Sequence, residues 1–247
     1  MKKVTLLFII SFLMSSCQQK ELDANQIVSK AIEVSGGEKY DSAKISFTFR
    51  DKQYKSTRKN GQFQLERFQE DTLGNKITDI VTNSGFTRSR NNKELSLADS
   101  KASAYSNSVN SVHYFVQLPY GLGGDAVNKT LLGKDSIKGQ EYYEIKVTFN
   151  QDGGGTDYED EYLYWINTNT FTVDYLAYSY HVNKGGIRFR AAFNPRVVNG
   201  LRFVDYKNYA EDDLSTPLEN LDELYEAGEL ELFSEIITED VEVTVSE

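Results

Sequence analysis

Few residues of this chain could carry nucleophilic chemistry. Its 247 residues include one cysteine, Cys17, and two histidines, His113 and His181. A Ser–His–Asp or Cys–His site needs a nucleophile held against an oriented imidazole, and the sequence contains no G-x-S-x-G motif. We therefore interpret both histidines as ordinary surface or rim residues.

The stretch "DGGGTDYEDEY" holds the densest group of acidic side chains, namely Asp152, Asp157, Glu159, Asp160 and Glu161. Oxygen ligands on a glycine-bent loop could hold Ca²⁺, but the stretch lacks the D-x-D-x-D-G order and the acid at the twelfth position. We therefore expect a solvated hairpin tip, with no metal and no cofactor. The alternative is an envelope hydrolase that uses the acidic cluster 157–161 or His181.

Two glycine-containing segments lack the context of a phosphate-binding loop. "PYGLGGD" does not join a strand to a helix, and in "LLGKDS" an aspartate follows Gly133 and Lys134 and would repel phosphate. We interpret both as loops beside a helix.

The setting of Cys17 indicates an attachment point. A lysine pair and an apolar run, residues 4–14, precede the small residues Ser15 and Ser16. This is the pattern of a secretory signal peptide, here residues 1–16. The run is too short for a transmembrane helix, which needs about 20 apolar residues.

The stretch Leu13–Cys17 resembles a bacterial lipobox, with Met14 departing from the more common leucine. The resemblance implies that the Cys17 thiol is diacylated, the peptide is cut before it, and the new amine is acylated. Several acyl chains anchor a protein stably, whereas one chain binds only marginally. Residues 17–24 would be the lipidated cysteine and a polar tether, and the protein would be exported and anchored in the cell envelope, at the outer membrane. The alternative is an ordinary signal peptide with an incidental cysteine.

The composition argues against nucleic acid as a partner. Removal of the signal peptide takes away Lys2 and Lys3 and no acid, so the net charge moves from −10 to −12. Phosphate binding would need a basic face. No second cysteine can form an intramolecular disulfide, so a packed core must stabilise the mature chain, which we expect to be a monomer.

Hydrophobic periodicity predicts one mainly β (α+β) domain over residues 25–247. Helical spacing starts near Asn25, with Asn25 or Asp23 as the cap and a Gly-Gly pair as the stop, after which the period changes to two residues. A central helix is predicted over residues 98–116, before Pro119. Five further strands, a short helix and a last strand follow, without the βαβα alternation of a Rossmann or TIM-barrel fold.

Aromatic residues are concentrated in the strands, and the chain has 16 Tyr, 14 Phe and one Trp. Tyr162 and Tyr164 share one face of their strand, and Trp165 lies on the other. Core packing is the default explanation, yet such a face on a curved sheet could present an apolar concavity to a lipid. Alternation alone selects the residues expected on this ligand-binding face: Phe47, Phe49, Phe63, Leu65, Tyr162, Tyr164, Leu176, Tyr178 and Tyr180.

The stretch "LYWINTNTFTVDYL" joins two strands through a W-I-N/D-x-x-T turn, and "VVNGLRF" precedes the next strand. With the order of elements, these motifs make residues 25–210 similar to the lipoprotein-sorting (LolA/LolB-like) superfamily and its related envelope lipoproteins. The resemblance implies a single curved antiparallel sheet, an incomplete β-barrel, whose concave side is plugged by the N-terminal and central helices.

Members of this superfamily bind or carry lipids or lipid-modified proteins without chemistry. Its soluble carriers lack a lipid anchor, so the anchor predicted here favours a fixed acceptor or receptor over a shuttle. The resemblance implies a lipid-anchored, non-catalytic envelope protein that binds a hydrophobic ligand, a lipid or lipoprotein acyl chains, in the concavity. The alternatives are the hydrolase described above and a scaffold or interaction module with a filled interior.

Overall fold

The computed structural model describes residues 21–152, 158–181 and 185–246. Helix α1 (Ala24–Ser35) begins at a capping box, in which the Asp23 side chain accepts from the Gln26 backbone N–H at 2.8 Å and the Asp23 N–H donates to the Gln26 side chain at 3.0 Å. The box satisfies two backbone donors that a helix start leaves without partners. Gly36 ends the helix at a φ of 139°, which favours glycine. Both expected ends of this helix are confirmed.

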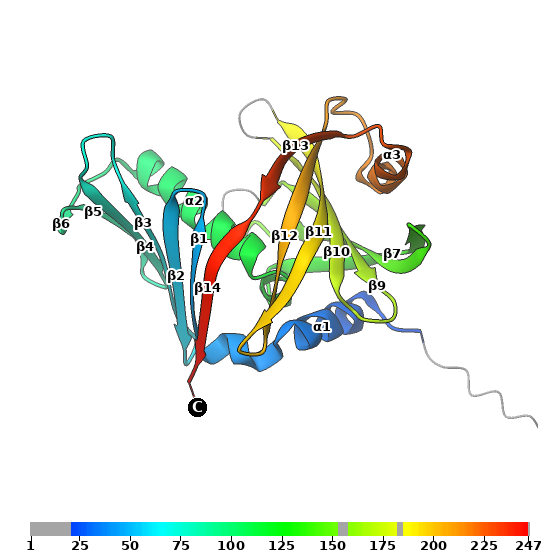
Figure 1. Cartoon of the computed structure of the whole chain (residues 1–247), viewed down its shortest axis with the longest axis horizontal. Coiled ribbons are helices and arrows are strands. Elements are labelled where there is room, and N and C mark those ends of the chain that lie inside the picture. The colour runs from blue at the N-terminus through cyan, green and yellow to red at the C-terminus, as the bar shows by residue number, and fades with distance from the viewer. Residues whose placement is uncertain (1–20, 153–157, 182–184, 247) are drawn as a thin grey trace, which may run out of the picture.

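Seven strands form the first antiparallel sheet, in the order β14-β1-β2-β3-β4-β5-β6. Figure 1 shows this sheet in blue and cyan, with the red strand β14 beside β1. The bounds are β1 (Ala43–Phe49), β2 (Lys52–Lys59), β3 (Gln62–Glu70), β4 (Lys76–Thr82), β5 (Gly85–Arg90), β6 (Lys93–Glu94) and β14 (Thr238–Val245).

Seven more strands form the second antiparallel sheet, in the order β13-β12-β11-β10-β9-β8-β7. Their bounds are β7 (Val127–Ile137), β8 (Gln140–Phe149), β9 (Glu161–Asn167), β10 (Val173–Tyr180), β11 (Gly186–Val198), β12 (Leu201–Glu211) and β13 (Glu231–Ile236). The glycine-containing segment at Gly133 was expected to be a loop, but it lies inside β7.

The two sheets meet at a corner where β13 continues into β14 with Ile237 between them (Figure 1). The buried Asp205 side chain holds this corner, because it accepts from the Thr238 N–H at 3.0 Å and pairs with Arg196 at 3.1 Å. The mainly β fold with an unclosed, barrel-like curvature is confirmed. It differs from the expected single sheet because the strands form two separate hydrogen-bonded sheets, joined where β13 continues into β14.

Helices fill and cover the sheets. The central helix α2 (Asp99–Val116) lies inside the concavity and packs on β3, β4 and β5, and α1 runs along one end of both sheets (Figure 1). The other helices of the described residues are the 3₁₀ turns η1 (Gly37–Ser42), η2 (Tyr120–Gly123) and η4 (Leu218–Asn220) and the short helix α3 (Leu221–Ala227). Among the described residues, no helix combines the length and apolar character that a membrane span requires.

Two apolar clusters lie on opposite faces of the second sheet. The larger cluster contains Ile27 of α1, Val112 of α2 and Tyr164 of β9, and it fills the space between the sheets. The smaller cluster packs Trp165 of β9 against Leu221 of α3, on the convex face. The short helix α3 covers part of the convex face, and the concave face is the one on which the sequence predicted a ligand.

Candidate functional site

The expected ligand-binding residues lie on the concave side, at different depths. Phe47, Phe49, Leu65, Tyr164 and Leu176 are buried, whereas Phe63, Tyr162, Tyr178 and Tyr180 are half-buried. Trp165 belongs to the cluster on the convex face, as the alternation predicted.

Four of the tyrosines form a continuous ladder of rings across β9 and β10. The Tyr162 ring stacks on Tyr178 at 5.5 Å and on Tyr164 at 6.3 Å, and Tyr178 lies 6.0 Å from Tyr180. The inner end of the ladder is filled, since Tyr164 is fully buried. Burial raises the pKa of Tyr164 well above its usual value, so this phenol is neutral in the folded protein.

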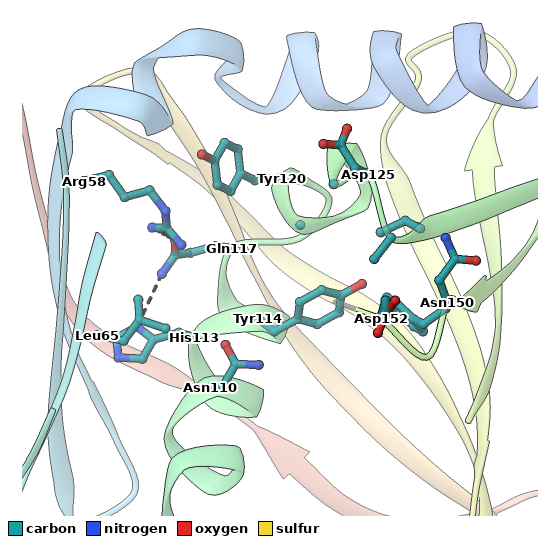
Figure 2. A pocket seen from close by; sticks show the side chains of 15 residues that line it. Arg58, Leu65, Asn110, His113, Tyr114, Gln117, Tyr120, Asp125, Asn150 and Asp152 are labelled. Atoms are coloured by element: carbon teal, nitrogen blue, oxygen red, sulfur yellow. Dashed lines mark hydrogen bonds between the residues drawn. The ribbon is translucent and has the colours of Figure 1, made fainter. Parts of the chain in front are cut away.

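An open cavity of about 620 Å³ lies beyond this ladder, at the C-terminal end of α2 (Figure 2). Residues from β2, β3, α2, η2, β7 and β8 line it: Arg58, Leu65, Asn110, His113, Tyr114, Gln117, Tyr120, Gly121, Gly124, Asp125, Ala126, Val127, Phe149, Asn150 and Asp152. Of the nine residues expected on the inner face, Leu65 lines this cavity directly. The ladder reaches it through Phe149, whose ring lies 5.7 Å from Tyr162.

A chain of hydrogen bonds runs along one wall of the cavity. Arg58 donates from Nη1 to Gln117 Oε1 at 2.6 Å, and Gln117 Nε2 lies 3.4 Å from His113 Nδ1 (Figure 2). His113 Nε2 lies 3.1 Å from the Glu66 carbonyl oxygen. Because a carbonyl can only accept, Nε2 carries the proton and Nδ1 accepts from the Gln117 amide.

The interpretation of His113 as a surface or rim residue was wrong. Its side chain is 1% exposed, and its ring packs edge-on against Phe47 and Tyr54. Burial lowers the pKa of His113 to about 4, so the imidazole is neutral at neutral pH. His113 therefore acts as a fixed link in the network and carries no charge into the cavity.

Arg58 was not selected from the sequence. Its strand, "KQYKSTRK", has no apolar alternation, although Tyr54, Ser56 and Arg58 lie on one face and the first two are buried. The Arg58 guanidinium lies over the Tyr120 ring at 4.9 Å. Tyr120 in turn stacks on Tyr40 at 4.8 Å and donates to Asp41 at 2.7 Å. The regular spacing of Tyr54, Ser56 and Arg58 was the only sequence signal for this position.

Asp152 of the acidic group lines this cavity, whereas Glu159, Asp160, Glu161 and His181 are not among the described residues that line it. His181 Nδ1 is 3.7 Å from Asp160 Oδ1, and Glu161 pairs with Lys146 at 2.9 Å. Asp157 falls outside the described residues. Within the described ranges, no group of three His, Cys, Asp or Glu side chains could hold a metal ion. The hydrolase alternative, which uses residues 157–161 or His181, stays a prediction.

The predicted anchor lies outside the described residues. Cys17 and the signal peptide precede residue 21, where the description begins. Lipidation of Cys17 therefore remains a prediction from the sequence.

Comparison with known proteins gives a family of unknown function and several structures of low identity. A family model described as "Family of unknown function (DUF6503)" matches residues 2–239, and no curated protein matches the chain. A LolA superfamily protein from Nitrosomonas europaea is similar at 15% identity and a TM-score of 0.48, covering 91% of this chain and 92% of that chain.

Two further solved structures are similar over shorter parts of this chain. A DUF1329 family protein from Desulfovibrio piger has 11% identity and a TM-score of 0.42, covering 76% of this chain and 84% of that chain. The lipoprotein LppX from Mycobacterium tuberculosis has 9% identity and a TM-score of 0.27, covering 66% of this chain and 89% of that chain.

Proposed function

The chain belongs to the DUF6503 family, and from this premise we propose that it is a lipid-anchored cell-envelope protein that binds a hydrophobic ligand on the concave side of its two sheets. The ligand is a lipid or the acyl chains of a lipoprotein. The protein binds this ligand without transforming it.

The cavity at the end of α2 is the observation that carries this proposal. Its volume of about 620 Å³ falls in the range of roughly 300–1,000 Å³ that is usual for small-molecule sites. Leu65, Val127 and Phe149 supply apolar wall, and the ring of Phe149 connects this wall to the half-buried Tyr162. An acyl chain that entered here would exchange water for apolar and aromatic surface.

The predicted anchor supports the envelope part of the proposal. Acyl chains on Cys17 would hold the domain by a tether of residues 17–24, at the outer membrane, facing either the periplasm or the cell surface. The membrane would then be the first partner of the protein, and its lipids or lipoproteins would be the ligands within reach.

Filling the cavity should test the proposal without disturbing the core. Gly124 lines the cavity at φ −66° and ψ 152°, angles that other residues adopt, and an added Cβ would lie 3.6 Å from Val127. We expect Gly124→Leu to lower the uptake of a fluorescent fatty acid several-fold and to reduce the co-purified lipid seen by native mass spectrometry of the full chain. Tyr164 is unsuitable for this test because its full burial would turn a substitution there into a test of folding.

The matched control is Gly133→Leu in β7. An added Cβ there would meet no heavy atom within 4 Å, and Gly133 does not line the cavity. This variant should take up the probe like the wild type. A wild-type chain that carries no lipid and takes up no fatty acid would contradict the proposal. Equal uptake by the two variants would show that the ligand binds outside this cavity.

A further inference from the structure

Resting on the proposed function, we propose that the hydrophobic ligand carries an anionic oxygen head group, a carboxylate or a phosphate, and that Arg58 binds this head group at the end of the cavity. This inference names the chemical class of the ligand and one residue that selects it. The apolar wall would receive the tail of the same molecule.

Arg58 stands at the boundary of two hollows. Together with Tyr120, it lines the cavity of about 620 Å³ and also a second cavity of about 510 Å³. The second cavity lies at the turn between β2 and β3 and also includes Lys59 and Phe63. The Arg58 side chain is half-buried, so a head group bound there could contact the guanidinium while it remained close to water.

The guanidinium of Arg58 has N–H donors that are not used in hydrogen bonds to the described residues. Arginine carries five N–H donors, and within the described residues Arg58 makes one side-chain hydrogen bond, to Gln117 at 2.6 Å. Tyr120 supports the flat face of the group at 4.9 Å, which leaves its edge available. A planar fork of this kind matches a carboxylate or phosphate in a bidentate geometry.

Most of the other arginines in the described part of the chain have a carboxylate within 4 Å, which Arg58 lacks. Asp79 pairs with Arg67 and Arg88. Asp205 pairs with Arg196, and Asp174 pairs with Arg202. In the described part of the chain, no carboxylate lies within 4 Å of Arg58, and the nearby Asp41 is bonded to Tyr120. Burial lowers the pKa of Arg58, and the opposite effect of the nearby Asp41 does not offset it.

The charges around the cavity give the ligand an orientation. Asp125 and Asp152 lie across the cavity from Arg58 (Figure 2), and His113 is neutral at neutral pH. An anionic head is therefore repelled from one end and attracted to the other. This arrangement would place the head on Arg58 and leave Leu65 and Phe149 to contact the tail.

The experiment compares three probes that share one acyl chain: oleate, oleyl phosphate and the neutral oleyl alcohol. Binding of each to the full chain, purified in a nonionic detergent, is measured by native mass spectrometry. We expect the wild type to bind at least one of the two anions about tenfold or more tightly than the alcohol, because hydrogen bonds to charged groups are the stronger ones. Arg58→Gln should abolish this preference, so that the anions bind no more tightly than the alcohol.

The matched control is Arg90→Gln, which removes one positive charge from β5 at a side chain that is 52% exposed. It should keep the preference for the anion. If Arg58→Gln does not fold, the preference of the wild type and its retention in Arg58→Lys, which keeps the charge, decide the question. Inorganic phosphate added alone should bind weakly, since a free anion lacks the tail.

The outcomes separate this inference from the proposed function. Equal binding of anion and alcohol by the wild type, or a preference that survives in Arg58→Gln, would overturn the anionic head group and leave the hydrophobic ligand standing. Tight binding of inorganic phosphate alone would show that Arg58 binds a free anion, and it would also overturn the inference of an anionic head group. A wild type that binds none of the three oleyl probes would remove the proposed function itself.

Discussion

His113 shows how burial changes the role of a residue. Its imidazole is neutral because burial lowers its pKa to about 4, whereas an unfolded histidine titrates near 6.5. At a pH between these two pKa values, His113 is protonated in the unfolded chain and neutral in the folded chain. The free energy of unfolding must therefore fall as the pH falls through this window.

We expect His113 to lower the free energy of unfolding by about 2 kcal/mol when the pH falls from 7 to 5. His113→Gln keeps an amide that can donate to the Glu66 carbonyl but cannot titrate. Urea unfolding at both pH values should show a smaller loss for the variant than for the wild type, by about that amount. Equal losses in the two proteins would mean that the folded His113 takes up its proton at the ordinary pH.

The residues of the candidate site were only partly predictable. Alternation placed Leu65 and Tyr162 on the concave side correctly, because a strand has a fixed period of two. It could not find Arg58 or His113, because a half-buried cation and a buried imidazole are explained by partners, Gln117 and the Glu66 carbonyl, that come from other elements. Strand alternation predicts the face on which a side chain lies, but it does not predict which residues of other elements contact that side chain.

At the scale of elements, an ion network fastens α2 to the first sheet. The fully buried Asp79 of β4 accepts from Arg67 of β3 at 2.8 Å and from Arg88 of β5. Arg67 also donates to Ser108 of α2 at 2.8 Å, and Arg88 lies 3.4 Å from the ring centre of Tyr105 on the same helix. Because α2 forms one wall of the cavity, this network also positions the site.

Asp79→Asn should destabilise the protein by about 3–5 kcal/mol, because it leaves two buried guanidinium groups without their counter-charge. The measurement is the midpoint of urea unfolding, which reports stability when the slope is unchanged. The matched control, Asp51→Asn, removes the same charge from a side chain that is 78% exposed and should leave the midpoint where it is. A small effect at Asp79 would show that the two arginines find other partners.

Elements with strong periodicity were predictable, and the edge strand β7 was not. The helices at residues 25–35 and 98–116 were expected from their apolar spacing, and α1 and α2 confirm them. Strand β7 was missed because it is an edge strand whose side chains alternate between half-buried and exposed, so Gly133 and Lys134 suggested a loop. Strand β7 buries too few of its side chains to leave an apolar signature.

At the scale of the whole molecule, the corner between β13 and β14 makes the concavity. Sequence alternation cannot locate such a corner, because the bend depends on Asp205 and Arg196 from other strands. The corner brings Leu65 of the first sheet and Phe149 of the second to one cavity. The proposed binding site is therefore a product of the assembled fold.

The last prediction concerns where this concavity is held. A tether of residues 17–24 extends at most about 28 Å, at roughly 3.5 Å per residue, so acyl chains on Cys17 would keep the cavity within reach of one membrane. Each buried CH₂ contributes about 0.8 kcal/mol, so several chains would give stable anchoring. We expect Cys17→Ser to leave the precursor unlipidated and to move the protein from the detergent phase to the aqueous phase in a phase-partition experiment.

Gln19→Ser in the same tether is the control, and it should stay in the detergent phase with the intact mass of an acylated chain. Because the folded domain is untouched by either change, both variants should bind oleate like the wild type. A Cys17→Ser protein that still enters the detergent phase would show that another part of the chain makes the membrane contact. In that case the protein would still be held at the membrane, but not through acyl chains on Cys17.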